Sequence, residues 1–117
     1  MKYMLLIATD PSEYATMTED DNLALMAEYR AFTQRIVESG EMVGGDPLHG
    51  VSTATTIKVR GGKTSVTDGP FAETKEHIGG YYIIDVATLD RALELAAQVP
   101  GARLGSIEVR PIQDMSM

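Results

Sequence analysis

The sequence contains no cysteine, which excludes disulfides, thiolate metal ligands and cysteine nucleophiles. This absence is compatible with a reducing compartment, and we expect a cytoplasmic location. Basic residues are also scarce, with 10 Lys and Arg against 17 Asp and Glu, giving a net charge of −7. The few cations form no stripe, so we expect no nucleic-acid partner.

Long hydrophobic runs are missing too. The apolar start, residues 1–8, is far shorter than the roughly 20 residues that span a membrane as a helix. Thr9, Asp10 and Pro11 end it at the length of a strand, so we interpret it as a strand and not as a signal peptide. We therefore expect no membrane partner, and one domain over residues 1–117 with a frayed tail at residues 113–117.

Two helices are predicted from caps and apolar spacing. Thr18 precedes three acidic residues, as an N-cap does, and Gly40 is placed to end the helix that follows. Thr88 caps the second helix, which Pro100 ends. The apolar stripes are Leu25, Tyr29, Phe32 and Ile36 in the first helix, and Leu89, Ala92, Leu93, Ala96 and Ala97 in the second.

Strands are predicted at residues 2–8, 79–86 and 106–112, and a hairpin at residues 54–67 that turns at Gly61 and Gly62. In this register Thr55 faces Asp68, which places Asp68 on the same face as Ile57 and Val66. Residues 41–43 read as a short strand, and residues 44–50, rich in Gly and Pro, as a loop. That loop is either a connection, which we favour, or the edge of a site.

The predicted order β-α-β-β-β-α-β is a ferredoxin-like α+β fold, a split βαβ pattern with an extra β-hairpin. Two helices cover one side of such a sheet. However, residues 3–8 and 81–84 are apolar on both faces, which is typical of strands covered on both sides. We therefore expect a homodimer that pairs through the open sheet faces.

The least generic stretch is residues 68–77, DGPFAETKEH. Gly69 permits unusual backbone angles and Pro70 fixes its own φ, so the turn holds Asp68 and Phe71 in fixed directions. Spacing alone favours a structural turn here over a functional site.

This stretch resembles the signature of the DGPF group of YCII-related proteins. Further resemblance extends along most of the chain, through residues 1–7, 29–33, 53–56 and 108–111. The resemblance implies a dimeric α+β barrel and a pocket with a catalytic His–Asp pair, whose aspartate matches Asp68. The family's histidine lies in the first helix, where this chain has none. His77 or His49 would then substitute, or the chemistry differs, or it is absent.

Arg30, Tyr82 and Phe71 are the candidate ligand-binding residues. Arg30 would hold an anion or pair with Asp68, or it simply belongs to a solvated helix face, which its position alone favours. A metal site among Asp68, Glu73, Glu76 and His77 is disfavoured, because Glu76 and His77 are adjacent and point differently. No cofactor motif is present, and we expect no cofactor.

Two functions stay open. The first is a small enzyme that performs lyase- or isomerase-type acid–base chemistry on a small molecule at Asp68, an analogy with related dimeric barrels. The second is a non-catalytic ligand-binding or regulatory module, which the resemblance links to extracytoplasmic-function sigma factors. A pocket with converging polar groups would favour the first, and a solvent-exposed Asp68 without a cavity would favour the second.

Overall fold

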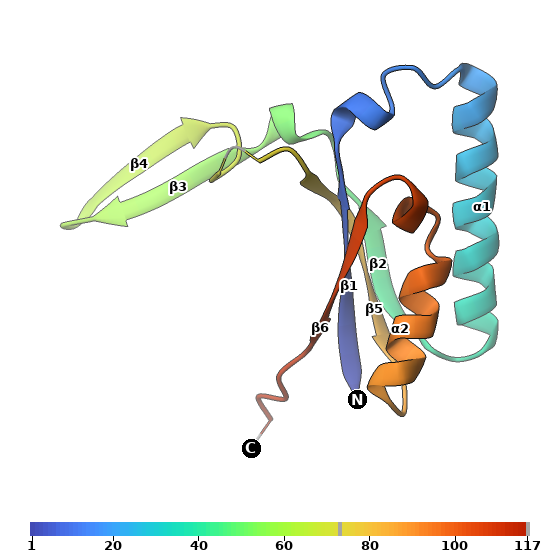
Figure 1. Cartoon of the computed structure of the whole chain (residues 1–117). Helices are drawn as coiled ribbons and strands as arrows, with labels where there is room; N and C mark the ends of the chain where they lie inside the picture. The colour runs from blue at the N-terminus through green and yellow to red at the C-terminus, as the bar shows by residue number, and fades with distance from the viewer. Residues whose placement is uncertain (73, 117) are drawn as a thin grey trace.

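The computed structural model describes residues 1–72 and 74–116. The chain runs from a strand through a long helix to an arm-like hairpin, and then through a strand and a second helix to the last strand (Figure 1). Its elements are β1 (Lys2–Thr9), η1 (Pro11–Glu13), α1 (Glu19–Glu38), β2 (Met42–Pro47), η2 (Val51–Thr53), β3 (Thr55–Arg60), β4 (Lys63–Asp68), β5 (His77–Asp85), α2 (Leu89–Gln98), η3 (Pro100–Arg103) and β6 (Ser106–Pro111).

Four strands form one antiparallel sheet in the order β2-β5-β1-β6. This order and the two helices are those of the expected ferredoxin-like α+β fold. Both helices lie on the same side of the sheet (Figure 1). Strands β3 and β4 form a separate two-stranded sheet inserted between β2 and β5.

The helix boundaries follow from the predicted caps. The Thr18 side chain accepts a hydrogen bond from the Asp21 amide while the Asp21 carboxylate accepts one from the Thr18 amide, a reciprocal capping box. Gly40, just beyond α1, has φ of 80°, a left-handed angle that glycine tolerates. Thr88 caps α2 through the Arg91 amide. Both caps confirm the sequence prediction.

The hydrophobic core lies between the helices and one face of the sheet. Leu5 pairs with Tyr82 on one side and with Val109 on the other, so their side chains share that face. Phe32 packs edge-on against Tyr82, with ring centroids 5.2 Å apart. The buried apolar residues are Tyr3, Leu5, Ile7, Phe32, Ile36, Tyr82, Ile84, Val86, Ala92, Leu95, Ala96 and Val99.

The opposite face of the sheet, which we call the open face, carries apolar side chains that no described helix covers (Figure 1). Met4 pairs with Ile83, and Leu6 pairs with Tyr81, so all four point to this face. These side chains are half-buried by their neighbours in the sheet. The two-faced apolar pattern of β1 and β5 therefore leaves one apolar surface outside the core.

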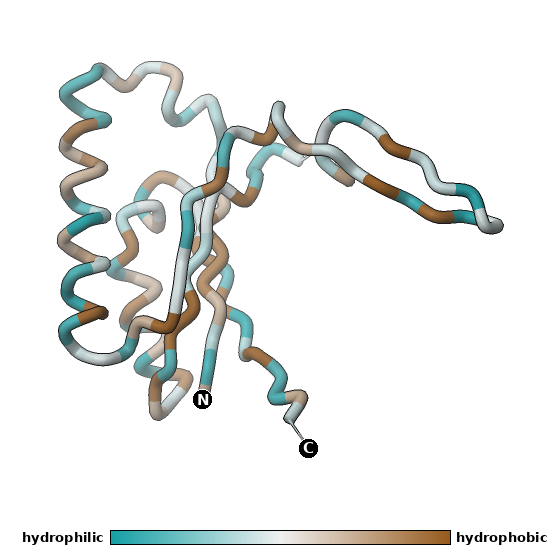
Figure 2. Tube along the Cα trace, turned by 180° about the vertical axis from the view of Figure 1, so that it is seen from behind, coloured by the Kyte–Doolittle hydropathy of each residue, from teal (hydrophilic) through white to brown (hydrophobic). Residues whose placement is uncertain are grey.

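The β3–β4 hairpin stands away from the body as an arm (Figure 1). Its register is the predicted one, with Thr55 opposite Asp68 and Ile57 opposite Val66. The apolar face of the arm does not reach the core, since Ile57 is 64% and Val66 65% exposed. Figure 2 shows the hydrophobic segments of both strands on this projecting arm.

The prediction of a loop over residues 44–50 was wrong for its first half, because β2 extends from Met42 to Pro47 as an edge strand. Gly45 fits there since a Cβ would lie 2.8 Å from the Tyr81 carbonyl oxygen. Pro47, which lacks an amide proton, is tolerated at the end of an edge strand. Sheet pairing thus overrides the loop-forming composition.

Two further features differ from the prediction. Strand β5 begins at His77, two residues before the predicted start at Gly79. In α2 the predicted stripe is partly wrong: Leu89 and Leu93 are exposed, whereas Leu95 is buried. Apolar residues lie on several sides of α2, so their spacing does not show which side is buried. The direction in which α2 packs against the sheet decides this.

An ion pair joins α2 to the short connection that links α1 with β2. Arg91 donates from Nε to Glu41 Oε2 and from a terminal nitrogen to Glu41 Oε1, both at 2.8 Å. These hydrogen bonds lower the pKa of Glu41 to about 2 from an ordinary value of 4.5.

We expect wild type to be more stable than Glu41→Gln at neutral pH. A carboxylate with a lowered pKa stabilises the folded state fully above its unfolded value, near pH 4.5, and loses this contribution as the pH falls towards about 2. Urea unfolding of both proteins at several pH values measures the difference. Equal stability at pH 7, or a difference that persists unchanged at pH 2, would contradict this account.

Candidate functional site

The larger of two cavities lies between the sheet and the stretch of α1 from Asn22 to Gln34. Phe32 and Ile36 fix the C-terminal half of α1 to the core. Nearer its start, α1 presents Leu25 and Met26 to an open space of about 1130 Å³, at the upper limit of typical ligand pockets. The wall of this cavity, which we call the α1 cavity, is mostly apolar, and the ends of β1, β2 and β5 complete it.

A pair of hydroxyl groups joins the helix to the sheet at this cavity. Thr33 Oγ1 and Tyr82 Oη lie 2.8 Å apart, and either atom can donate. Tyr29 lines the same space, and burial, followed by the proximity of Tyr14, raises the pKa of Tyr29 to about 12. Its hydroxyl therefore stays protonated at neutral pH and is available as a donor.

Charged and polar groups stand around the mouth of the α1 cavity. Arg30 and Asn22 come from α1, and Arg30 is solvent-exposed. Tyr81 also borders the cavity, but its side chain points to the open face, where it donates a hydrogen bond of 2.9 Å to Asp46 Oδ2 that raises the pKa of Tyr81. An apolar space with three tyrosine side chains and one arginine suits a ring-bearing molecule with an anionic group. The three tyrosines are Tyr14, Tyr29 and Tyr82.

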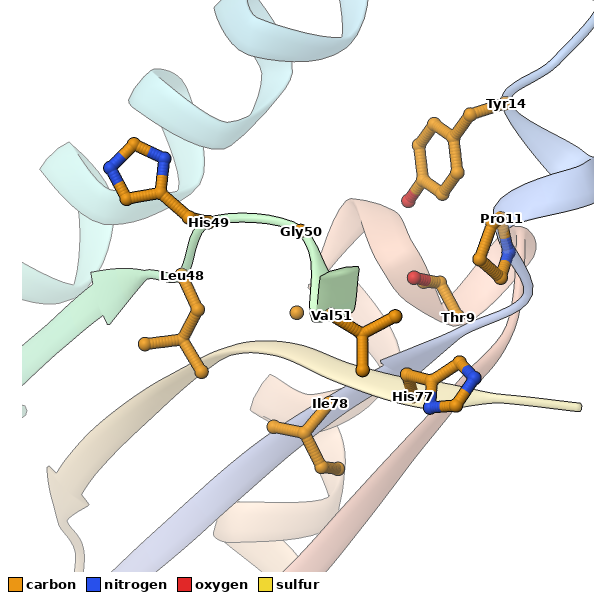
Figure 3. Close-up of a pocket in the computed structure, with 10 residues that line it drawn as sticks. Thr9, Pro11, Tyr14, Leu48, His49, Gly50, Val51, His77 and Ile78 are labelled. Atoms are coloured by element: carbon orange, nitrogen blue, oxygen red, sulfur yellow. The ribbon is translucent and has the colours of Figure 1, made fainter. Parts of the chain in front are cut away.

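Both histidines of the chain line a second, smaller pocket of about 240 Å³, which we call the histidine pocket. In Figure 3 the rings of His49 and His77 lie on opposite sides of it, and Thr9 at the end of β1 and Tyr14 just after η1 lie at its edge. His49 comes from the loop after β2, and His77 from the first position of β5. His77 Nδ1 lies 3.5 Å from Thr74 Oγ1.

The two cavities adjoin each other. Thr9, Tyr14 and Gly79 line both of them. A molecule in the α1 cavity therefore approaches the histidine pocket past Tyr14. The arrangement offers an apolar binding space beside groups suited to proton transfer.

Asp68, the predicted polar centre, lies elsewhere. It ends β4 at the base of the arm, is exposed, and lines neither of these two cavities. The turn after it is held by other groups, since the Gly69 amide donates to the Ala54 carbonyl and Thr56 Oγ1 donates to the Gly69 carbonyl, both at 2.7 Å. Gly69 has φ of 104°, as the turn requires of a glycine. Phe71 is 84% exposed.

The structure thus brings the predicted residues together in three places. Arg30 and Tyr82 share the α1 cavity, His49 and His77 share the histidine pocket, and Asp68 and Phe71 lie at the arm. For the disfavoured metal set, residues 1–72 and 74–116 contain no cluster of three His, Cys, Asp or Glu residues that would hold a metal ion. Glu73, one member of that set, lies outside the described residues.

Comparison with known proteins identifies the family. The model of the YCII-related domain matches residues 1–116. The chain belongs to the YCII-related family. It is also similar to an uncharacterized protein of Rhizobium meliloti (strain 1021), 37% identical over 114 residues, which are 96% of this chain and 92% of that protein.

In the part of this YCII-related chain that the structure describes, no helix has the length and hydrophobicity that a membrane crossing requires.

Only weak sequence signals point to the cavity-lining residues Leu25, Met26 and Thr33. They belong to or lie beside the apolar stripe of α1, and such a stripe predicts a core. Periodicity shows which side of a helix faces the sheet, but not how far from the sheet that side stands. The five tyrosines were a better signal, because the side chains of three of them line one cavity.

We expect Asp68→Asn in this YCII-related protein to change the free energy of unfolding by less than about 0.5 kcal/mol, as usual for exposed side chains. Among the described residues its carboxylate accepts no hydrogen bond, and the turn is held by backbone groups and Thr56. Urea denaturation measures the change. A loss of about 1 to 3 kcal/mol, the range for hydrogen bonds to charged groups, would show that Asp68 is structural.

Proposed function

We propose that this YCII-related protein binds a small molecule with an apolar ring and an acidic group in the α1 cavity. The observation that carries the proposal is the combination of a mostly apolar space of about 1130 Å³ with Arg30 at its mouth and protonated hydroxyl groups inside. The apolar wall accommodates the ring, and the guanidinium attracts the acid.

We further propose acid–base chemistry on the bound molecule, as an isomerase or a lyase performs. The support is the adjoining histidine pocket, since His77 or His49 provides a base or acid next to the ligand. We also propose that the chain belongs to the DGPF group, on its residues 68–76. Asp68 lies at the base of the arm, away from both cavities, so it takes part in this chemistry only if the arm contacts a cavity.

Arg30→Gln tests the binding site. Isothermal titration with benzoate, phenylacetate and the matching neutral alcohols measures affinity. We expect the acids to bind to wild type and to lose about tenfold in affinity in the variant, because a hydrogen bond to a charged group contributes about 1.5 kcal/mol or more. The alcohols should be unaffected.

Arg35→Gln is the matched control, since Arg35 lies on the same helix but over the Phe32 ring, outside the cavity lining. Equal losses in both variants, or no binding of acids to wild type, would exclude the α1 cavity as this site. Exchange of the ligand's carbon-bound protons in D₂O, followed by NMR, reports the chemistry. Exchange as fast in His77→Gln/His49→Gln as in wild type would refute the roles of the histidines.

A second candidate function is a non-catalytic ligand-binding or regulatory module, with the sigma-factor link that the DGPF resemblance implies. The exposed Asp68, which lines neither cavity, favours it. Ligand binding without proton exchange would support this function over the first.

We also propose that the protein is a homodimer paired through its open faces. The support is the row of apolar side chains there, Met4, Leu6, Tyr81 and Ile83, which no described helix covers. Leu6→Glu should place a charge in this interface and shift the sedimentation coefficient to that of a monomer at micromolar concentration.

Leu93→Glu, the same change at an exposed leucine of α2 on the helix side, should leave the dimer intact. Circular dichroism checks that both variants fold. A wild-type monomer, or a Leu6→Glu dimer as stable as wild type, would contradict this mode of pairing.

A further inference from the structure

The surface of this chain is too large for a compact monomer of its size. It exposes 8217 Å², whereas a folded monomer of 12.7 kDa exposes about 6,200 Å². The radius of gyration is 16.3 Å, against about 13.4 Å for a compact domain of this length. The excess of roughly 2,000 Å² is the area that one subunit buries in an extensive dimer, and much of it is the arm.

The arm has two chemically distinct parts. One face carries Ile57, Val59 and Val66, each more than half exposed. At the tip Arg60 and Lys63 pair across the turn on the face opposite to Ile57, so their long side chains meet a neighbour at the end of the arm and not along its apolar face. With Lys58 and Asp68, residues 55–68 have a net charge of +2, whereas the whole chain has −7, which leaves −9 on the rest.

An acidic surface complements this tip. Residues 3–29 contain no Lys or Arg, and Asp10, Glu13, Glu19 and Asp20 lie in or next to η1 and the first turn of α1. All of these except Asp10 are exposed. These four residues, which we call the acidic rim, flank in the sequence Tyr14, which lines the α1 cavity, and their segment lies at the same end of the molecule as the base of the arm (Figure 1).

We propose that the arm of each chain reaches across a second copy of this chain, so that its basic tip lies against the partner's acidic rim and its apolar face covers the mouth of the partner's α1 cavity. A two-fold axis along the strands places both arms at the cavity ends, and each pair of surfaces then meets twice. The proposal rests on the pairing of open faces described above.

The dimensions allow this contact. A strand of six residues spans about 20 Å, and packed layers lie about 10 Å apart, so an arm that leaves one sheet passes the partner's sheet and reaches its helix layer. There Met26, 57% exposed on α1, offers an apolar surface to Ile57 and Val59. The α1 cavity, open in one chain, is closed only when the partner's arm covers it.

A charge exchange between the two surfaces tests the proposal. Arg60→Glu/Lys63→Glu reverses the tip, and Glu19→Lys/Asp20→Lys reverses the rim. Each variant alone should raise the dimer dissociation constant by at least tenfold at 50 mM salt, with a smaller effect at 0.5 M because salt screens surface charges. An equimolar mixture should form a heterodimer as tight as wild type, since each reversed tip or rim then meets its opposite charge.

Analytical ultracentrifugation of fluorescently labelled chains measures these constants, and circular dichroism confirms folding. Arg35→Glu, compared with Arg60→Glu, makes the same change of charge on α1 away from the rim and should leave the dimer unchanged. A mixture no tighter than its two components would overturn the arm exchange, as would reversed tips that leave association unchanged. In either case a dimer lost in Leu6→Glu would still support the pairing of open faces.

Discussion

The structure depends on the burial of one face of the four-stranded sheet by the C-terminal half of α1 and by α2. Phe32 and Ile36 insert from α1 beside Tyr82 and Ile84 of β5, and Phe32 meets Tyr82 edge-on. Further along α1, Tyr29 packs against the core and Glu28 pairs with Arg103 of η3. Another side of α1, which includes Met26 and Arg30, is left beside the α1 cavity, so the packing that stabilises the fold also shapes the candidate site.

A second consequence is that the same sheet has an apolar face without a helix. Strands β1 and β5 carry apolar side chains on both faces, and two helices on one side cover only half of them. The exposed apolar side of the arm adds to this surface. Such surfaces are rare on monomers and frequent at interfaces between subunits. The open face and the arm therefore both support assembly of this chain into a dimer.

The chemistry of the site is divided between places that lie far apart in the sequence. Arg30 and the side chains of Tyr14, Tyr29 and Tyr82 line the larger cavity, and the two histidines line the smaller pocket beside it. Asp68, which carries the family resemblance, lies at the base of the arm. Within one chain these groups do not form a single site. Any role of residues 68–71 in the site therefore depends on what the arm contacts.

The sequence alone determined the order of the elements, the caps of both helices and the hairpin register that pairs Thr55 with Asp68. These features depend on neighbouring residues: a cap needs one side chain near its own backbone, and two glycines set the turn. The sequence also indicated, through strands that are apolar on both faces, that one sheet face would lack a helix.

Only the tertiary structure decided which residues surround a cavity. The spacing of Leu25, Met26 and Tyr29 is the same whether α1 touches the sheet or stands away from it, and the distance is set by Phe32 and Ile36 further along. Strand β2 was likewise decided by its pairing with β5, against a composition typical of loops. The position of the arm, exposed rather than folded onto the core, depends on long-range contacts that no local pattern encodes.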